Sequence, residues 1–375
     1  MKRSRFNRLN QVIFLFLLTL IFSFKTGGQI LKDAETVTLI RQGIGHIYNF
    51  KFDEAEKVLD QLKVSYPGHP VINLYKGMMI YWQNFPLIPS SAKRSAFEQE
   101  LYRSIELSSR NIPSVDYEAE YLLANLSARG LLLLFYADNG LSSEVIPLAA
   151  ETYRPLMQSF RYTSECPDLY YFTGVYNYYR DAYPRVRPIY KAVAFLFPQG
   201  NMQLGLQQLE ICGKEAMALQ AEAYSIISWI RMHFENDYQK SLPYCKLLYE
   251  KYPDNVFFKS MYIKNLLLLK KYNEAEEILG IESETDTNSF YKALRSFFTG
   301  IIFEKKYRNF GNAGKFYHEA IDALQPFGEY GKEYQAYAYF GLSRLGLKED
   351  EKHQRRIYRR KALELSDFKK ITFDD

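Results

Sequence analysis

The sequence predicts an all-α fold in which antiparallel helix pairs stack side by side as an α-solenoid. Small residues recur with a spacing of 34 residues, so that Gly77 follows Gly43 and Ala275 follows Ser241. Two antiparallel helices and their turns take about 34 residues. Large apolar residues recur between these positions at helical spacing, and no segment shows the alternation of a half-buried strand.

Residues 1–29 have the features of a secretory signal peptide. Four basic residues precede an apolar run of 13 residues, Val12 to Phe24, which small and polar residues close. A membrane-spanning helix needs about 20 residues, so the length favours a signal peptide over an uncleaved membrane anchor, which is the alternative. No Ala-x-Ala motif marks a cleavage position. Because of these signal-peptide features, we expect an exported protein of a bacterial envelope, in the periplasm or on the periplasmic face of the outer membrane.

The charge of the chain is balanced once this segment is set aside. The chain has 48 Lys and Arg against 43 Asp and Glu, and the five basic residues of the segment account for the excess. The balance gives no reason to expect nucleic acid or an anionic membrane as a partner. One dense basic cluster has acidic residues around it, which favours a solvated helix face over a binding patch. It consists of Arg355, Arg356, Arg359, Arg360 and Lys361.

Residues 30–165 form the predicted N-terminal helical-repeat region. Its first unit runs from Thr36 to His69, and Asp53 is expected to cap the second helix. The next unit is interrupted by prolines after its first helix, 71–81. Helical spacing then continues without the repeat at 97–107, 117–136 and 144–160. We expect 117–136 to be a central helix that is buried on most sides, since its polar residues argue against a membrane span.

Residues 166–375 form the predicted C-terminal repeat array. Units begin near Glu222 and Val256, and a third is marked by Gly300 and Ala313. A last, degenerate pair contains Gly341 and ends in a charged helix near Leu365. The polarity of that helix suits a terminal cap with one face in water.

These units resemble the tetratricopeptide-repeat superfamily over about half of the chain, as an exported member of a Bacteroidota-type bacterium. The resemblance implies a stacked superhelix that holds other proteins. A weaker resemblance concerns residues 168–209. There, Tyr170 to Tyr176 before a long helix, and Phe197 to Leu206 before the repeats, are similar to the segment that precedes the C-terminal repeats of the inclusion-body-clearance family of helical-repeat proteins. This second resemblance implies no chemistry.

No catalytic, cofactor or metal site is predicted. The chain has no HExxH, GxSxG, Walker or strand-linked GxGxxG motif, and its five histidines are scattered. Cys166, Cys212 and Cys245 are an odd number for an exported protein, so buried free thiols are expected, with one disulfide as the alternative.

The inner groove of the superhelix is the predicted partner site. Positions 2, 5, 9 and 12 of each first helix usually line it in these repeats. The groove residues expected here are Ile226, Ile230, His233, Phe257, Lys264, Leu267, Phe297 and Ile301. A clamp for a carboxylate needs several Lys, Arg or Asn residues, and only Lys264 is suitable. The apolar groove either binds a segment of a partner or is filled by helices of the chain itself.

The predicted function is a non-catalytic scaffold or adaptor that binds an envelope protein or peptide of unknown identity, with no membrane span after cleavage of the signal. The alternative is a carrier that encloses a small apolar or peptide ligand in a closed superhelix. A third class, a catalytic helical ring, requires a clustered acid pair or metal site that the sequence does not show.

Overall fold

The computed structural model describes residues 29–110, 112, 114–186, 197–280, 287–345, 352–366 and 373. The predicted signal peptide lies, except for Gln29, outside the described residues. None of the described helices is long and apolar enough to cross a membrane.

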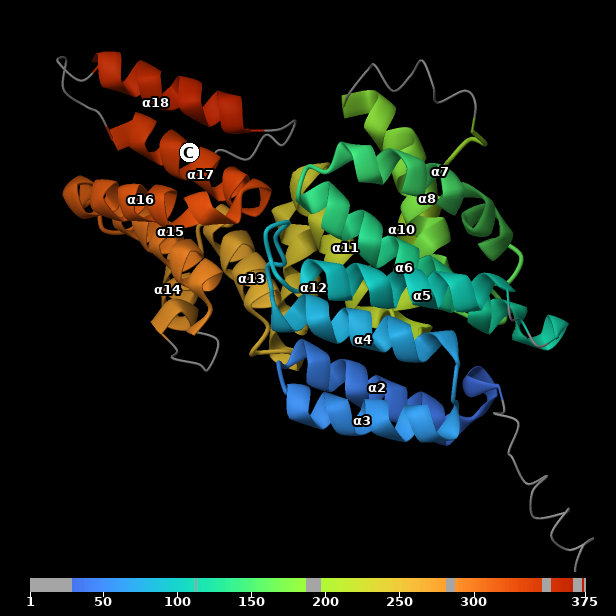
Figure 1. Ribbon diagram of the computed structural model, residues 1–375. Helices are drawn as coiled ribbons and strands as arrows, with labels where there is room; N and C mark the ends of the chain where they lie inside the picture. Colours follow the sequence, from blue (N-terminus) through green and yellow to red (C-terminus); the bar gives the residue numbers. More distant parts are fainter. Residues whose placement is uncertain are drawn as a thin grey trace, which may run out of the picture.

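The described residues form helices and no strand (Figure 1). Consecutive helices pack against one another in adjacent pairs. The α-helices are α2 (Ala34–Tyr48), α3 (Phe52–Ser65), α4 (Pro70–Gln83), α5 (Arg94–Arg110), α6 (Glu118–Asp138), α7 (Ser142–Ser159), α8 (Leu169–Val186), α10 (Met202–Glu215), α11 (Gln220–His233), α12 (Tyr238–Lys251), α13 (Val256–Leu268), α14 (Tyr272–Gly280), α15 (Ser289–Lys305), α16 (Phe310–Leu324), α17 (Glu329–Leu345) and α18 (Lys352–Leu365).

The recurring glycines lie where two helices approach closely. A Cβ atom on Gly43 would lie 2.3 Å from Tyr75 Oη, and one on Gly300 would lie 2.7 Å from the ring of Tyr317. The fully buried Ala275 takes the corresponding small position on α14. Residues without a large side chain are therefore needed here for the helices to pack, as the 34-residue spacing predicts.

Two local predictions were wrong. Helix α3 begins at Phe52 and its N-cap residue is Lys51, so Asp53 lies inside the first turn and no side chain caps the helix. Tyr170 to Tyr176 do not precede a long helix. They lie within α8, which begins at Leu169.

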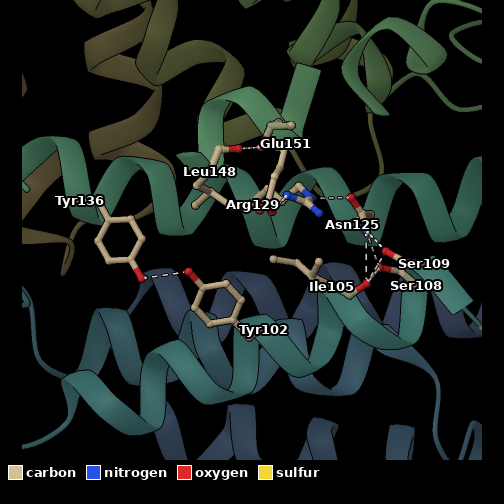
Figure 2. A network of polar contacts seen from close by, with 10 residues as sticks. Tyr102, Ile105, Ser108, Ser109, Asn125, Arg129, Tyr136, Leu148 and Glu151 are labelled. Carbon is tan, nitrogen blue, oxygen red and sulfur yellow. Dashed lines mark hydrogen bonds and ion pairs between the residues drawn. The ribbon is translucent and has the colours of Figure 1, made fainter. Parts of the chain in front are cut away.

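Helix α6 is the predicted central helix, and most residues of its first half are buried. Its polar residues join it to α5 and α7, as Figure 2 shows. Asn125 Nδ2 donates to the hydroxyls of Ser108 and Ser109 at 3.0 Å, and its Oδ1 accepts from Arg129 Nε at 3.0 Å. Arg129 also reaches Glu151 on α7. The polar side chains that argued against a membrane span thus hold three helices together.

The first helices contact the second half of the chain directly. Asn255, the N-cap of α13, donates to the backbone oxygen of Tyr48 at 3.2 Å. The hydroxyl of Tyr48 donates to Glu222 on α11, and Tyr81 contacts Tyr330 on α17 at 3.2 Å. One cluster of buried apolar residues includes members from both halves. The division at residue 165 remains a prediction from the sequence, although the two regions share this core.

The cysteines and the last helix agree with the sequence interpretation. All three cysteines are buried free thiols. The basic residues of α18 are exposed, and Arg360 lies 3.7 Å from Glu364 one turn later. This is the arrangement of a solvated helix face.

Candidate functional site

A pocket of about 270 Å³ lies between α11, α13, α15 and α17. We call it the lysine pocket, because Lys264 of α13 is among its lining residues. Each helix presents residues three or four positions apart, which lie on one helix face. The main lining residues are Trp229 and His233 of α11, Phe257, Ser260 and Lys264 of α13, Phe290 and Leu294 of α15, and Tyr330, Glu333, Tyr334 and Tyr337 of α17.

Lys264 is 2% exposed, and its ammonium group is held by both charge and rings. Its Nζ donates to Glu333 Oε1 at 2.9 Å. It also lies 5.1 Å from the ring centre of Tyr337 and 5.4 Å from that of Tyr334. A buried cation needs such partners, since its desolvation is otherwise costly. The lysine is therefore a fixed charge of the pocket and not a solvated side chain.

His233 completes a triangle with Lys264 and Glu333. Its Nε2 lies 3.0 Å from Lys264 Nζ and 3.0 Å from Glu333 Oε1. Its Nδ1 lies 3.1 Å from the carbonyl oxygen of Trp229, which can only accept, so Nδ1 carries a hydrogen. Nε2 accepts from Lys264 Nζ when the imidazole is neutral and donates to Glu333 Oε1 when the imidazole is protonated. The indole of Trp229 stacks on the imidazole with ring centres 3.7 Å apart and fixes its plane.

The tyrosines of α17 form the opposite wall. Burial raises the pKa of the Tyr334 and Tyr337 hydroxyls, and the charge of Glu333 raises both further. The Tyr337 hydroxyl donates to Glu333 Oε1. Burial likewise raises the pKa of Tyr330. These phenols stay protonated at neutral pH, so they can donate hydrogen bonds and offer ring faces but cannot serve as bases.

Ser260 gives the pocket an unused polar group. Its side chain is 2% exposed, and its Oγ has no hydrogen-bond partner within the described structure. Leaving a buried hydroxyl unsatisfied costs about 1–3 kcal/mol. A ligand with a donor or acceptor at this position would recover part of that cost.

The predicted groove residues are divided between the pocket and the core. His233, Phe257 and Lys264 line the lysine pocket together. Four others are buried in the apolar core, namely Ile230, Leu267, Phe297 and Ile301. Ile226 is half-buried and packs against the cluster that contains Ile230. The aliphatic part of the groove is thus filled by the chain itself.

The tyrosines and Glu333 of α17 escaped the sequence analysis. With Gly341 at position 8, the last predicted repeat begins at Tyr334, so Tyr330 and Glu333 precede its first position. Helix α17 begins earlier, at Glu329, and its additional turn carries these residues to the pocket. The spacing of Tyr330, Tyr334 and Tyr337 was the available signal, because it places all three on one helix face.

A second hollow of about 560 Å³ lies at the start of α10, beside α8 and α11. It has no aromatic wall, and its Arg231 is paired with Glu235. Within the described ranges, no group of His, Cys, Asp and Glu residues is arranged to hold a metal ion. The lysine pocket is therefore the candidate site.

Comparison with protein-family models and with curated proteins finds no match for this chain.

Proposed function

We propose that the protein is a non-catalytic adaptor of the bacterial cell envelope, and that it holds a segment of a partner protein at the lysine pocket. The observation that carries the proposal is the pocket itself. Aromatic rings from four helices line it together with a buried lysine, and the buried hydroxyl of Ser260 is unsatisfied. Aromatic walls with a few fixed polar groups suit the capture of a short segment with defined orientation.

The proposal includes a tetratricopeptide-repeat superhelix as the scaffold. Its support is the 34-residue spacing together with the packing of consecutive helices in pairs. The proposed location, in the periplasm or on the periplasmic face of the outer membrane, rests on the signal-peptide features of residues 1–29 alone.

A carrier of a small apolar or peptide ligand is the second candidate function. Its support is the volume of the pocket, about 270 Å³, which is near the lower limit of the range typical for small-molecule sites. The aliphatic groove residues are buried in the core. A small ligand would therefore bind in this pocket, against its aromatic walls.

Site-specific photo-crosslinking tests the adaptor function. A benzophenone amino acid replaces Phe257, a half-buried residue of the pocket wall, in the protein expressed in its native envelope. The control carries the same group at Val64, which is exposed on α3. We expect a defined partner adduct from position 257 that position 64 does not give. Identical adducts from both positions, or none from either, would refute capture at the pocket. A small molecule extracted with the purified protein in the second case would favour the carrier.

A further inference from the structure

The lining of the lysine pocket includes both surface and interior residues. Ala137 and Glu329 are exposed, Phe257 and Tyr330 are half-buried, and Ser260 is buried. The volume is about 270 Å³. An apolar cavity of about 150 Å³ is large enough for a benzene molecule, so this pocket has room for one substituted ring. Its aromatic walls favour such a ring, because aromatic pairs gain energy beyond the area that they bury.

The charges of the lining favour a neutral ligand. Lys264 is paired with Glu333 at 2.9 Å, and Lys332 is paired with Glu329. A carboxylate ligand would compete with Glu333 for the lysine and would meet the negative charge of Asp138, which also lines the pocket. An ammonium ligand would meet the positive charge of Lys264. Since a buried charge is costly unless it is paired, neither ion suits the pocket.

The hydroxyl of Ser260 selects a ring with one polar group. Its Oγ is buried without a hydrogen-bond partner in the described structure, one turn before Lys264 on α13. A serine hydroxyl can donate one hydrogen bond and accept others, and a phenol hydroxyl can do the same. Among the side chains of proteins, tyrosine combines a neutral aromatic ring with such a hydroxyl.

We propose that the lysine pocket recognises a tyrosine side chain of the partner segment, with its ring between the aromatic walls and its hydroxyl bonded to Ser260 Oγ. This inference rests on the proposed adaptor function for the existence of a partner segment. It goes further in naming the side chain that the segment presents and the residue that reads it.

The test uses the purified full chain and small molecules that copy single side chains. The probe p-cresol is the side chain of tyrosine, toluene lacks its hydroxyl, and 4-methylbenzoate replaces the hydroxyl by a carboxylate. Ligand-observed NMR titrations measure the dissociation constants for the wild type, for Ser260→Ala and for Ser343→Ala. Ser343 is the matched control, because it is a buried serine of α17 that does not line the pocket and whose Oγ donates to the backbone oxygen of Phe340. Circular dichroism establishes that each variant is folded.

We expect Ser260→Ala to weaken the binding of p-cresol about tenfold and to leave the binding of toluene unchanged, because only p-cresol loses a hydrogen bond. Ser343→Ala should bind both molecules as the wild type does. The wild type should bind 4-methylbenzoate at least tenfold more weakly than p-cresol. An equal effect of Ser260→Ala on p-cresol and toluene, no binding of p-cresol to the wild type, or a preference for the carboxylate would each overturn the inference.

Two capped peptides distinguish a tyrosine of a protein segment from a free phenol. The wild type should bind acetyl-Gly-Tyr-Gly-amide at least as tightly as p-cresol, and acetyl-Gly-Phe-Gly-amide more weakly. Binding of p-cresol without binding of the tyrosine peptide would overturn the inference in favour of a small phenolic ligand. Photo-crosslinking at position 257 detects a partner whichever side chain it presents, so a failure of the adaptor function is distinguishable from a failure of tyrosine recognition.

Discussion

Replacing Glu222 by glutamine should stabilise the protein at pH 8 and have little effect near pH 4.5. Glu222 lies on α11 where the first helix pair meets the second half of the chain. Its Oε1 accepts from the Tyr48 hydroxyl, and its Oε2 is buried without a hydrogen-bond partner in the described structure. Burial raises the pKa of this carboxyl to about 7, and the charge of Asp168 acts in the same direction.

The sign of the effect follows from proton binding in the two states. Below the unfolded pKa of 4.5, Glu222 is protonated whether the chain is folded or not, and burial of the neutral acid has no ionic cost. Between pH 4.5 and about 7 the unfolded chain releases this proton while the folded chain keeps it, so stability falls as the pH rises. Above pH 7 the loss is complete. A shift from 4.5 to about 7 corresponds to about 3 kcal/mol.

Glutamine keeps the shape of the side chain and cannot ionise. The free energy of unfolding from urea titrations should therefore be about 3 kcal/mol higher for Glu222→Gln than for the wild type at pH 8, and nearly equal at pH 4.5. Glu250→Gln on the exposed face of α12 is the control and should show no pH-dependent difference. A Glu222→Gln variant that is less stable than the wild type at pH 8, or equally stable at both pH values, would refute this reasoning.

Three further substitutions test the packing. Ala275→Arg places a charge at a fully buried position of α14, so we expect thermal melting to lose the C-terminal helices, and an unchanged melting curve would contradict the repeat register. Asp168→Ala removes the carboxylate that accepts hydrogen bonds from three backbone N–H groups before α11, so the free energy of unfolding in urea should fall by about 2–5 kcal/mol. Asp60→Ala, at an exposed position, is the control. If both variants lost the same stability, Asp168 would not hold this turn. Gly205→Ala puts a Cβ atom 2.7 Å from the backbone of α8 and should lower the free energy of unfolding by about 1–3 kcal/mol. Gly280→Ala is the control and should lose no stability, because the space around Gly280 is open. Equal stabilities of the two variants would show that α8 and α10 can move apart without cost.

The helices could be predicted from the sequence because their determinants are local. The small residues at Gly43, Gly300 and Ala275 fix where one helix meets the next, and the partner is within a few tens of residues along the chain. The helix boundaries followed the same periodic positions to within a few residues. Prediction of the cap at Asp53 failed because the helix begins one residue before it and its N-cap is Lys51.

Only the part of the candidate site on α11 and α13 could be predicted from the sequence. His233, Phe257 and Lys264 were predicted from the groove positions of two predicted repeats, and they line one pocket. The repeat positions that usually line a groove do not show which of these residues remain accessible to a ligand. Phe297 and Ile301 take predicted groove positions as well, yet both are fully buried, and Phe297 packs against Tyr334.

By itself, the sequence determined the helical class, the pairing of neighbouring helices and three residues of the lysine pocket, since each depends on contacts between segments close in the chain. Only the tertiary structure decided that Tyr48 meets Glu222, that Tyr81 meets Tyr330 and that Phe373 packs against Tyr337. The physical reason is that small differences in the packing angles of the intervening helices accumulate along the chain. Their sum, which no local pattern encodes, sets which distant side chains come together.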